Sequence, residues 1–168
     1  MPLEIPASNV DIFVKITGVK SGWIKGESED AKHKGEIDVE SYHVGVNQGF
    51  NTTGLPTGKR QWKQFIFRMR SQVATPLLLS ACSCNEVLKT AVFTCRKAGG
   101  KQEEYMIWTL TNCSIADYKT GYVTDDTLIP HDEVSLVFQK IELDYKPQKA
   151  DGTLGPSVVF VDDFQARV

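Results

Sequence analysis

The residue types that most often carry chemistry are few in this chain and widely spaced. Its three histidines, His33, His43 and His131, fall in separate segments, and no two have the spacing of ligands to one metal ion. Acid–base or nucleophilic catalysis needs such groups within hydrogen-bond reach of a partner. The sequence therefore predicts no catalytic residue, no metal site and no enzymatic activity.

The cysteines show neither the paired spacing of a zinc site nor that of a redox motif. They are Cys82, Cys84, Cys95 and Cys113. Cys82 and Cys84 are two residues apart on a predicted helix, so their side chains point to nearly opposite faces. We interpret the cysteines as small buried apolar side chains of a chain kept in a reducing compartment.

Pairs of glycine and of aspartate can form phosphate or calcium sites in other sequence contexts. Gly99–Gly100 lies in no phosphate-binding or dinucleotide fingerprint and is typical of a tight hairpin turn. Asp125–Asp126 and Asp162–Asp163 lack the spaced oxygen ligands of a calcium loop. No cofactor is expected.

The charge pattern narrows the classes of partner. Nineteen Lys and Arg against 21 Asp and Glu give a net charge of −2, and the basic cluster Lys32–Lys34 is flanked by acidic residues. Nucleic acid binding needs a clustered basic surface, so nucleic acid is not an expected partner. The opening residues carry Glu4 and Asp11, which predicts no signal peptide, and no apolar run is long enough for membrane insertion. We expect the new chain to stay in the cytosol.

Alternating apolar residues predict short strands in the first half of the chain. The first strand covers Ile12–Ile16, and the charged, glycine-containing residues 19–35 predict a long loop after it. The alternation changes phase within residues 36–46, which predicts a bend, and residues 47–60 predict a second loop. Residues 61–70 predict a strand with Phe65, Phe67 and Met69 on one face.

The second half of the chain predicts one helix followed by further strands. Thr75–Pro76 is a typical helix start, and apolar residues at helical spacing over Leu77–Leu88 predict about three turns. Strands follow over 89–97, 102–112, 114–123 and 133–145, and Ala98–Lys101 joins the first two as a hairpin. A phase change in the last strand predicts a second bend.

Six or seven strands, two bends and one helix define the expected fold class. It is mainly β, with two packed curved sheets forming a barrel-like domain and one α-helix on the side. Residues 1–168 contain no repeat and no linker, so a single domain is predicted.

Four blocks of the sequence resemble the haemolysin-coregulated protein (Hcp) family in order and spacing. They are residues 11–16 with 26–39, the helix start at 75–82, the hairpin at 96–110 and the closing segment at 141–152. Residues 20–25 lengthen the first loop relative to the family, and the tail at 153–168 has no match.

The resemblance implies a structural, non-enzymatic subunit of the inner tube of a type VI secretion system. Members of this family form hexameric rings that stack into a hollow tube, which a contracting sheath expels. The implied partners are identical copies, the spike protein, the contractile sheath and the secreted effector proteins that the tube carries or chaperones. The implied location is the bacterial cytoplasm before firing, and then the extracellular medium or a target cell.

The same resemblance selects two sets of candidate site residues. The loop 19–35 matches a protruding family loop in part, and its aromatic and charged residues are typical of an interface. The predicted ring-stacking residues are Trp23, Lys25, Glu27, Asp30, Lys32 and His33. The predicted lumen-facing residues are Arg68 and Arg70, from the alternation of their strand, and Ser114, Asp117 and Lys119, from the family match.

Two other classes of function stay open. One is a specialised Hcp-like effector or tip-associated component, in which residues 20–25 or the tail add a binding function. The other is a monomeric small β-barrel protein that binds a ligand or hydrolyses a substrate, supported by the fold class alone. The molar mass in solution separates a ring from a monomer.

Overall fold

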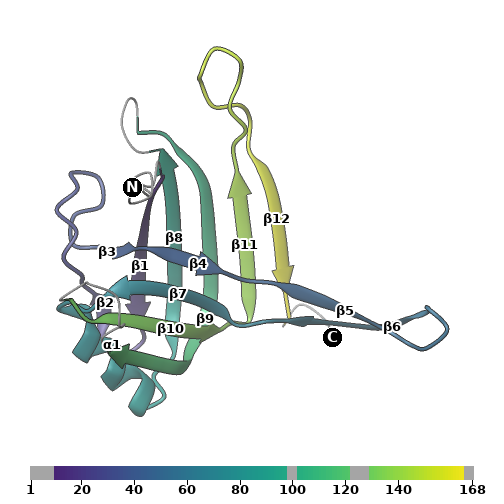
Figure 1. Cartoon of the computed structure of the whole chain (residues 1–168), viewed down its shortest axis with the longest axis horizontal. Helices are drawn as coiled ribbons and strands as arrows, with labels where there is room; N and C mark the ends of the chain where they lie inside the picture. Colours follow the sequence, from purple (N-terminus) through teal and green to yellow (C-terminus); the bar gives the residue numbers. More distant parts are fainter. Residues whose placement is uncertain (1–9, 98–101, 122–128, 165–168) are drawn as a thin grey trace, which may run out of the picture.

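The computed structural model describes residues 10–97, 102–121 and 129–164 (Figure 1). Twelve β-strands and one α-helix lie within these ranges. The strands outnumber the six or seven predicted mainly because β-strands also form in residues 19–35 and 47–60, which were predicted as loops, and in the tail after residue 153. The predicted hairpin turn at 98–101 and the aspartates at 125–126 lie outside the described residues.

The larger layer, which we call the first layer, is antiparallel with the strand order β2-β1-β8-β9-β11-β12. Its strands are β1 (Val10–Gly18), β2 (Gly22–Ile24), β8 (Leu88–Lys97), β9 (Glu104–Gly121), β11 (Lys140–Tyr145) and β12 (Val158–Asp163), with the short β3 (Ile37–Val39) beside β1. β12 lies in the tail at 153–168, for which the sequence showed no resemblance to the Hcp family, and it pairs with β11 along its whole length.

The second layer consists of the end of β9 with β10 (His131–Val137), β7 (Phe65–Arg70) and β4 (Ser41–His43). β9 belongs to both layers: it pairs with β11 up to Thr111 and with β10 from Ser114 onward. Between them Asn112 has a φ of 51°, a left-handed conformation that asparagine tolerates better than most residues. The prediction of two separate strands over 102–123 is therefore wrong, because one long strand bends there.

The strands of the second layer run across those of the first, and the core lies between the two layers (Figure 1). Phe65, Phe67 and Met69 face inward and are fully buried, as the alternation predicted. The ring centroids of Phe65 and Phe93 are 4.3 Å apart. The predicted mainly β fold of two curved layers is confirmed, and the layers resemble a barrel without closing into one.

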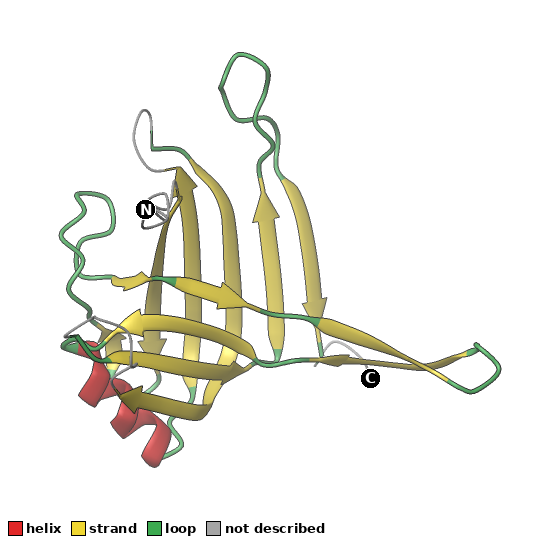
Figure 2. Ribbon diagram, in the orientation of Figure 1, coloured by secondary structure: helices red, strands yellow, loops and turns green. Residues whose placement is uncertain are grey.

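Helix α1 (Ala74–Ser83) lies at one end of the two layers (Figure 2). Its buried residues are Ala74, Leu78 and Ala81. It ends earlier than predicted, because Leu88 begins β8. Thr75 does not cap it: the helix has no side-chain cap, and the Thr75 hydroxyl donates instead to the buried carboxylate of Asp132 over 2.6 Å.

Residues 47–60 form a projecting hairpin, so the prediction of a loop there is wrong. β5 (Val46–Phe50) and β6 (Pro56–Trp62) pair as a separate two-stranded sheet, which we call the arm (Figure 1). Nearly all its residues are exposed on both faces. An exposed strand needs no alternation of apolar and polar residues, and the turn-forming residues therefore dominated the prediction.

The other predicted bends and loops are confirmed in part. The strand predicted over 133–145 is interrupted at Phe138–Gln139, between β10 and β11, where the second bend was predicted. The segment with the first predicted bend is divided into β3 and β4. The loop predicted over 19–35 is wrong for Gly22–Ile24, because these residues form β2 and pair with the end of β1. The rest of that loop carries no strand or helix.

Candidate interaction surfaces

The loop after β2 is held against the first layer by two side chains on Phe13 of β1. The imidazole of His33 stacks on the Phe13 ring with centroids 4.4 Å apart. The guanidinium carbon of Arg96 lies 4.8 Å from the centroid of the same ring. The outer face of β1 and β8 is therefore covered by the loop at this point.

His33 is buried and bridges two carboxylates. Its Nε2 lies 2.7 Å from Oε1 of Glu104 on β9, and its Nδ1 is hydrogen bonded to the carboxylate of Glu36. Only 7% of the residue is exposed. His33 thus ties the loop to β9 and is not presented to another chain.

Arg96 is the second anchor of the loop. Its guanidinium donates to Asp30 of the loop, over 2.9 Å from Nη1, and to Asp11 of β1, over 3.2 Å from Nη2. The hydrogen bonds from Arg96 are the largest cause that lowers the pKa of Asp30 to about 2. Asp30 is therefore an ionised partner of a buried cation.

Trp23 of β2 has two lysines close to its indole ring. The Nζ atoms of Lys15 and Lys25 are 4.7 Å and 5.1 Å from its ring centroids, within the range of cation–π attraction. Gly35, with a φ of 79°, leaves room for the indole ring. Trp23 remains half-buried, and its buried Nε1 has no hydrogen-bond partner among the described residues.

The six predicted ring-stacking residues therefore divide into two groups. Asp30 and His33 are engaged inside the chain. Lys25, Glu27 and Lys32 are exposed, and Trp23 is half-buried close to two lysines. A stacking contact made by this surface stays a prediction for these four residues.

Three charged side chains form a row on the outer face of the second layer. Glu133 of β10 is in register with Arg68 of β7 on one side and with Lys119 of β9 on the other. The Nζ of Lys119 lies 4.0 Å from Glu133 and 3.6 Å from Asp117. Arg68, Asp117 and Lys119, all predicted to face a lumen, share this polar face.

The remaining predicted lumen-facing residues, Arg70 of β7 and Ser114 of β9, lie beside opposite ends of β10. Arg70 is exposed beside His131, and both approach the carboxylate of Glu40, at 3.9 Å and 3.0 Å. Ser114 is half-buried at the other end, paired with Val137 near the bend of β9. That this face lines a lumen stays a prediction.

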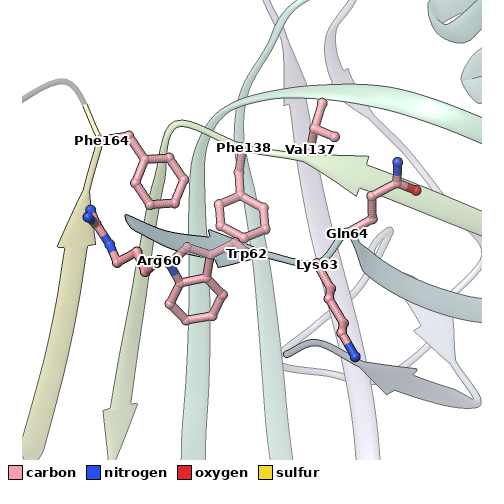
Figure 3. A pocket seen from close by; sticks show the side chains of 7 residues that line it. All are labelled: Arg60, Trp62, Lys63, Gln64, Val137, Phe138 and Phe164. Atoms are coloured by element: carbon pink, nitrogen blue, oxygen red, sulfur yellow. The ribbon is translucent and has the colours of Figure 1, made fainter. Parts of the chain in front are cut away.

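A cavity of about 410 Å³ opens at the base of the arm (Figure 3). It is lined by Arg60, Trp62, Lys63, Gln64, Val137, Phe138 and Phe164. The ring centroids of Trp62 and Phe138 are 5.8 Å apart, and those of Phe138 and Phe164 are 6.0 Å apart. We call this cavity the aromatic pocket.

Asp162 of β12 fixes the arm beside the aromatic pocket. Its Oδ2 accepts a hydrogen bond from Trp62 Nε1 over 2.9 Å, and both its oxygens accept from the guanidinium of Arg60. The partners are about one hundred residues apart in the chain. No pattern of spacing in the sequence indicates such a pairing, which is why the aromatic pocket was not predicted.

No metal-binding group was found in the part of the chain that the structure describes. No cluster of three or more His, Cys, Asp or Glu side chains there could hold an ion. Of the cysteines, Cys95 and Cys113 are buried as interpreted, and burial raises the pKa of Cys113 to about 12. Cys84 is exposed, so the interpretation is wrong for that residue. Among the described residues, no helix has the length and apolar character needed to cross a membrane.

The fold and its surfaces define a β-rich scaffold whose prominent features are a projecting arm and an aromatic pocket. A family model described as "Type VI secretion system effector, Hcp" matches residues 13–145. The chain belongs to this Hcp family, as its sequence blocks predicted.

Individual relatives agree with that assignment. The protein hcp1 of Pseudomonas aeruginosa strain PAO1 is 37% identical over 147 residues, which cover 85% of this chain and 87% of the relative. The crystal structure of Hcp1 from Salmonella typhimurium has a TM-score of 0.73 at 27% identity and covers 94% of this chain and 96% of its own. A type VI secretion system effector from Yersinia pestis has a TM-score of 0.72 at 29% identity, over 91% of this chain and 99% of its own.

Proposed function

We propose that this chain is a structural subunit of a type VI secretion inner tube. Six copies close into a ring, the rings stack into a hollow tube lined by the polar face of the second layer, and the expelled tube carries or chaperones effectors. Membership of the Hcp family carries the proposal. The proposed partners are further copies, the spike protein, the sheath and effectors, and the proposed route leads from the bacterial cytoplasm out of the cell.

The free edge of β12 supports contact between copies. Among the described residues β12 pairs with β11 alone. Its four apolar residues are exposed on both faces: Val158, Val159, Phe160 and Val161. An edge strand with exposed apolar side chains is a template for pairing with another chain, and natural monomers usually protect such edges. We assign this edge to the ring contact, which is heterologous and closes by rotation.

The molar mass of the purified protein tests the proposal. Light scattering coupled to size-exclusion chromatography should give a particle six times the mass of one chain, and electron micrographs should show annular particles. A mass equal to one chain at every concentration would contradict the tube function and favour the monomeric alternative.

Replacing both Trp23 and Lys25 with alanine should shorten tubes without breaking rings. The two side chains form an aromatic and cationic surface beside the exposed part of the loop, and such groups are common interface anchors. Tube length in electron micrographs measures the effect, and light scattering measures the rings. Lys89→Ala, which removes an exposed lysine from β8, is the matched control. Tubes of unchanged length in the double variant would remove this assignment.

A further inference from the structure

Both ring nitrogens of the buried His33 face carboxylate oxygens. Nε2 lies 2.7 Å from Oε1 of Glu104, and Nδ1 is hydrogen bonded to Glu36. An ionised carboxylate has no proton to donate, so each of the two contacts needs an N–H group of the imidazole. Only the doubly protonated imidazolium carries both N–H groups. The geometry therefore fits a positively charged ring.

The burial of this site makes its carboxylates dependent on that charge. Only 9% of Glu36 is exposed, and an ionised carboxylate that is buried without a cation is costly in free energy. Phe13 stacks on the imidazole with an angle of 8° between the ring planes, and it covers that face of the ring. The imidazolium of His33 is the buried cation that Glu36 contacts.

The other charged side chains around the ring are engaged elsewhere or lie nearer to solvent. The guanidinium of Arg96 on β8 donates to Asp30 of the loop and to Asp11 of β1. The remaining groups are Asp38 of β3, in register with Phe13, and Lys32, Glu103 and Lys146, which line a surface hollow with Glu104. These four are exposed or half-buried. Histidine is the side chain whose charge ordinarily changes between pH 5 and 8, so the ring of His33 is where a change of pH would act.

Loss of one ring proton breaks this arrangement. A neutral imidazole has one N–H group and one lone pair, so one of its nitrogens then presents a lone pair to a carboxylate oxygen. Glu104 is the partner that separates, because 34% of its side chain is exposed and water can replace its contact. Glu36 is more deeply buried and belongs to the loop itself. The contact that is lost is the one between the loop and β9.

We propose that His33 is a pH-sensitive switch. As the imidazolium it holds residues 31–36 of the loop against β9, and loss of one ring proton releases them, while Arg96 still holds Asp30. The folded chain binds the proton between two carboxylates, so the contact is complete at low and neutral pH and is lost as the pH rises through the titration of His33. The released residues include Lys32, an exposed member of the predicted ring-stacking set. The contact lies within one chain, so the inference does not depend on ring or tube formation.

Two measurements on the full-length wild-type protein test the switch. With labelled histidine, nuclear magnetic resonance should show both ring nitrogens of His33 protonated at pH 6 and one of them unprotonated at pH 9. Hydrogen exchange over residues 31–36, corrected for the intrinsic rate at each pH, should show protection that falls by at least about tenfold from pH 6 to pH 9, as loss of a hydrogen bond to a charged group does. A neutral ring at pH 6, or protection that stays the same at pH 9, would overturn the proposal.

Glu104→Gln separates the switch from a merely structural contact. A glutamine side chain accepts from a protonated Nε2 and donates to an unprotonated one, so it keeps the contact in both states of the ring. Protection of residues 31–36 in this variant should therefore change by less than about twofold between pH 6 and pH 9, since the hydrogen bond persists. A tenfold fall in this variant as well would show that the release does not pass through Glu104, which would refute the switch. If the variant does not fold, the labelled histidine of the wild-type protein still decides.

The two other histidines supply matched controls. His43→Gln removes an exposed histidine from β4, and His131→Gln removes the histidine beside Glu40. Neither side chain contacts the loop through a described hydrogen bond or ion pair, so both variants should keep the pH dependence of residues 31–36. Loss of that dependence in either control would assign the titration to a histidine other than His33 and would refute the proposal.

Discussion

Replacing Arg96 with alanine should lower the free energy of unfolding by about 3–5 kcal/mol, the usual effect of removing one member of a buried ion pair. Only 3% of Arg96 is exposed, and it donates to both Asp11 and Asp30. Its loss leaves the carboxylate of Asp30 without its cation and uncovers the ring of Phe13. Unfolding in urea at neutral pH measures the change.

Two further variants separate the contributions of charge and geometry. Arg96→Lys keeps the charge but cannot donate to two carboxylates in a planar fork, so it should recover part of the stability. Arg68→Ala removes an arginine that is exposed on the second layer and should change stability little. Equal stability of Arg96→Ala and the wild-type protein would show that the loop is held by other contacts.

The change of stability with pH in acid provides a second test of the contact between Arg96 and Asp30. Because the pKa of Asp30 is lowered, its ionised form stabilises the fold at any pH above the ordinary value of about 4. That contribution is lost as the pH falls from about 4 to about 2, the pKa of Asp30 in the folded chain. Arg96→Ala should flatten the fall in stability over this range. An identical pH dependence in both proteins would contradict the assignment.

The sequence predicted those parts of the fold in which burial alternates or recurs. Phe65, Phe67 and Met69 show this most clearly, because one face of β7 meets the core and the other meets solvent. The helix was also predicted, although its end was not, since Leu88 continues the apolar pattern from helix into strand. Local patterns report which face is buried, and they report element ends poorly.

The surfaces were predicted less well because they depend on contacts between distant residues. His33 was assigned to an exposed stacking loop, yet its partner Glu104 lies 71 residues further along the chain. Asp30 and Arg96 are 66 residues apart. The sequence alone does not distinguish an aspartate that faces solvent in a loop from an aspartate that pairs with a buried arginine. Lys25 and Lys32 of the same set are exposed, and their role in ring stacking stays a prediction.

Replacing Asp162 with alanine should release the arm from the body of the molecule. The substitution removes the acceptor shared by Arg60 and the indole N–H of Trp62, and it leaves the guanidinium beside the aromatic pocket without that partner. Trypsin cleaves after Lys59 and Arg60, which lie in the arm. Cleavage there should become at least about tenfold faster, because proteolysis of a folded chain follows the free energy of local opening. Losing a hydrogen bond to a charged group lowers that free energy by about 1.5 kcal/mol or more, which is roughly tenfold in rate.

The neighbouring carboxylate supplies the control for this prediction. Asp163 follows Asp162 in β12, so strand alternation places its side chain on the opposite face of the sheet. Asp163→Ala should therefore leave the rate of cleavage in the arm near that of the wild-type protein, as measured by mass spectrometry of the released peptides. An arm that resists trypsin equally in both variants would show that strand pairing and the Trp62 ring contacts hold it without Asp162.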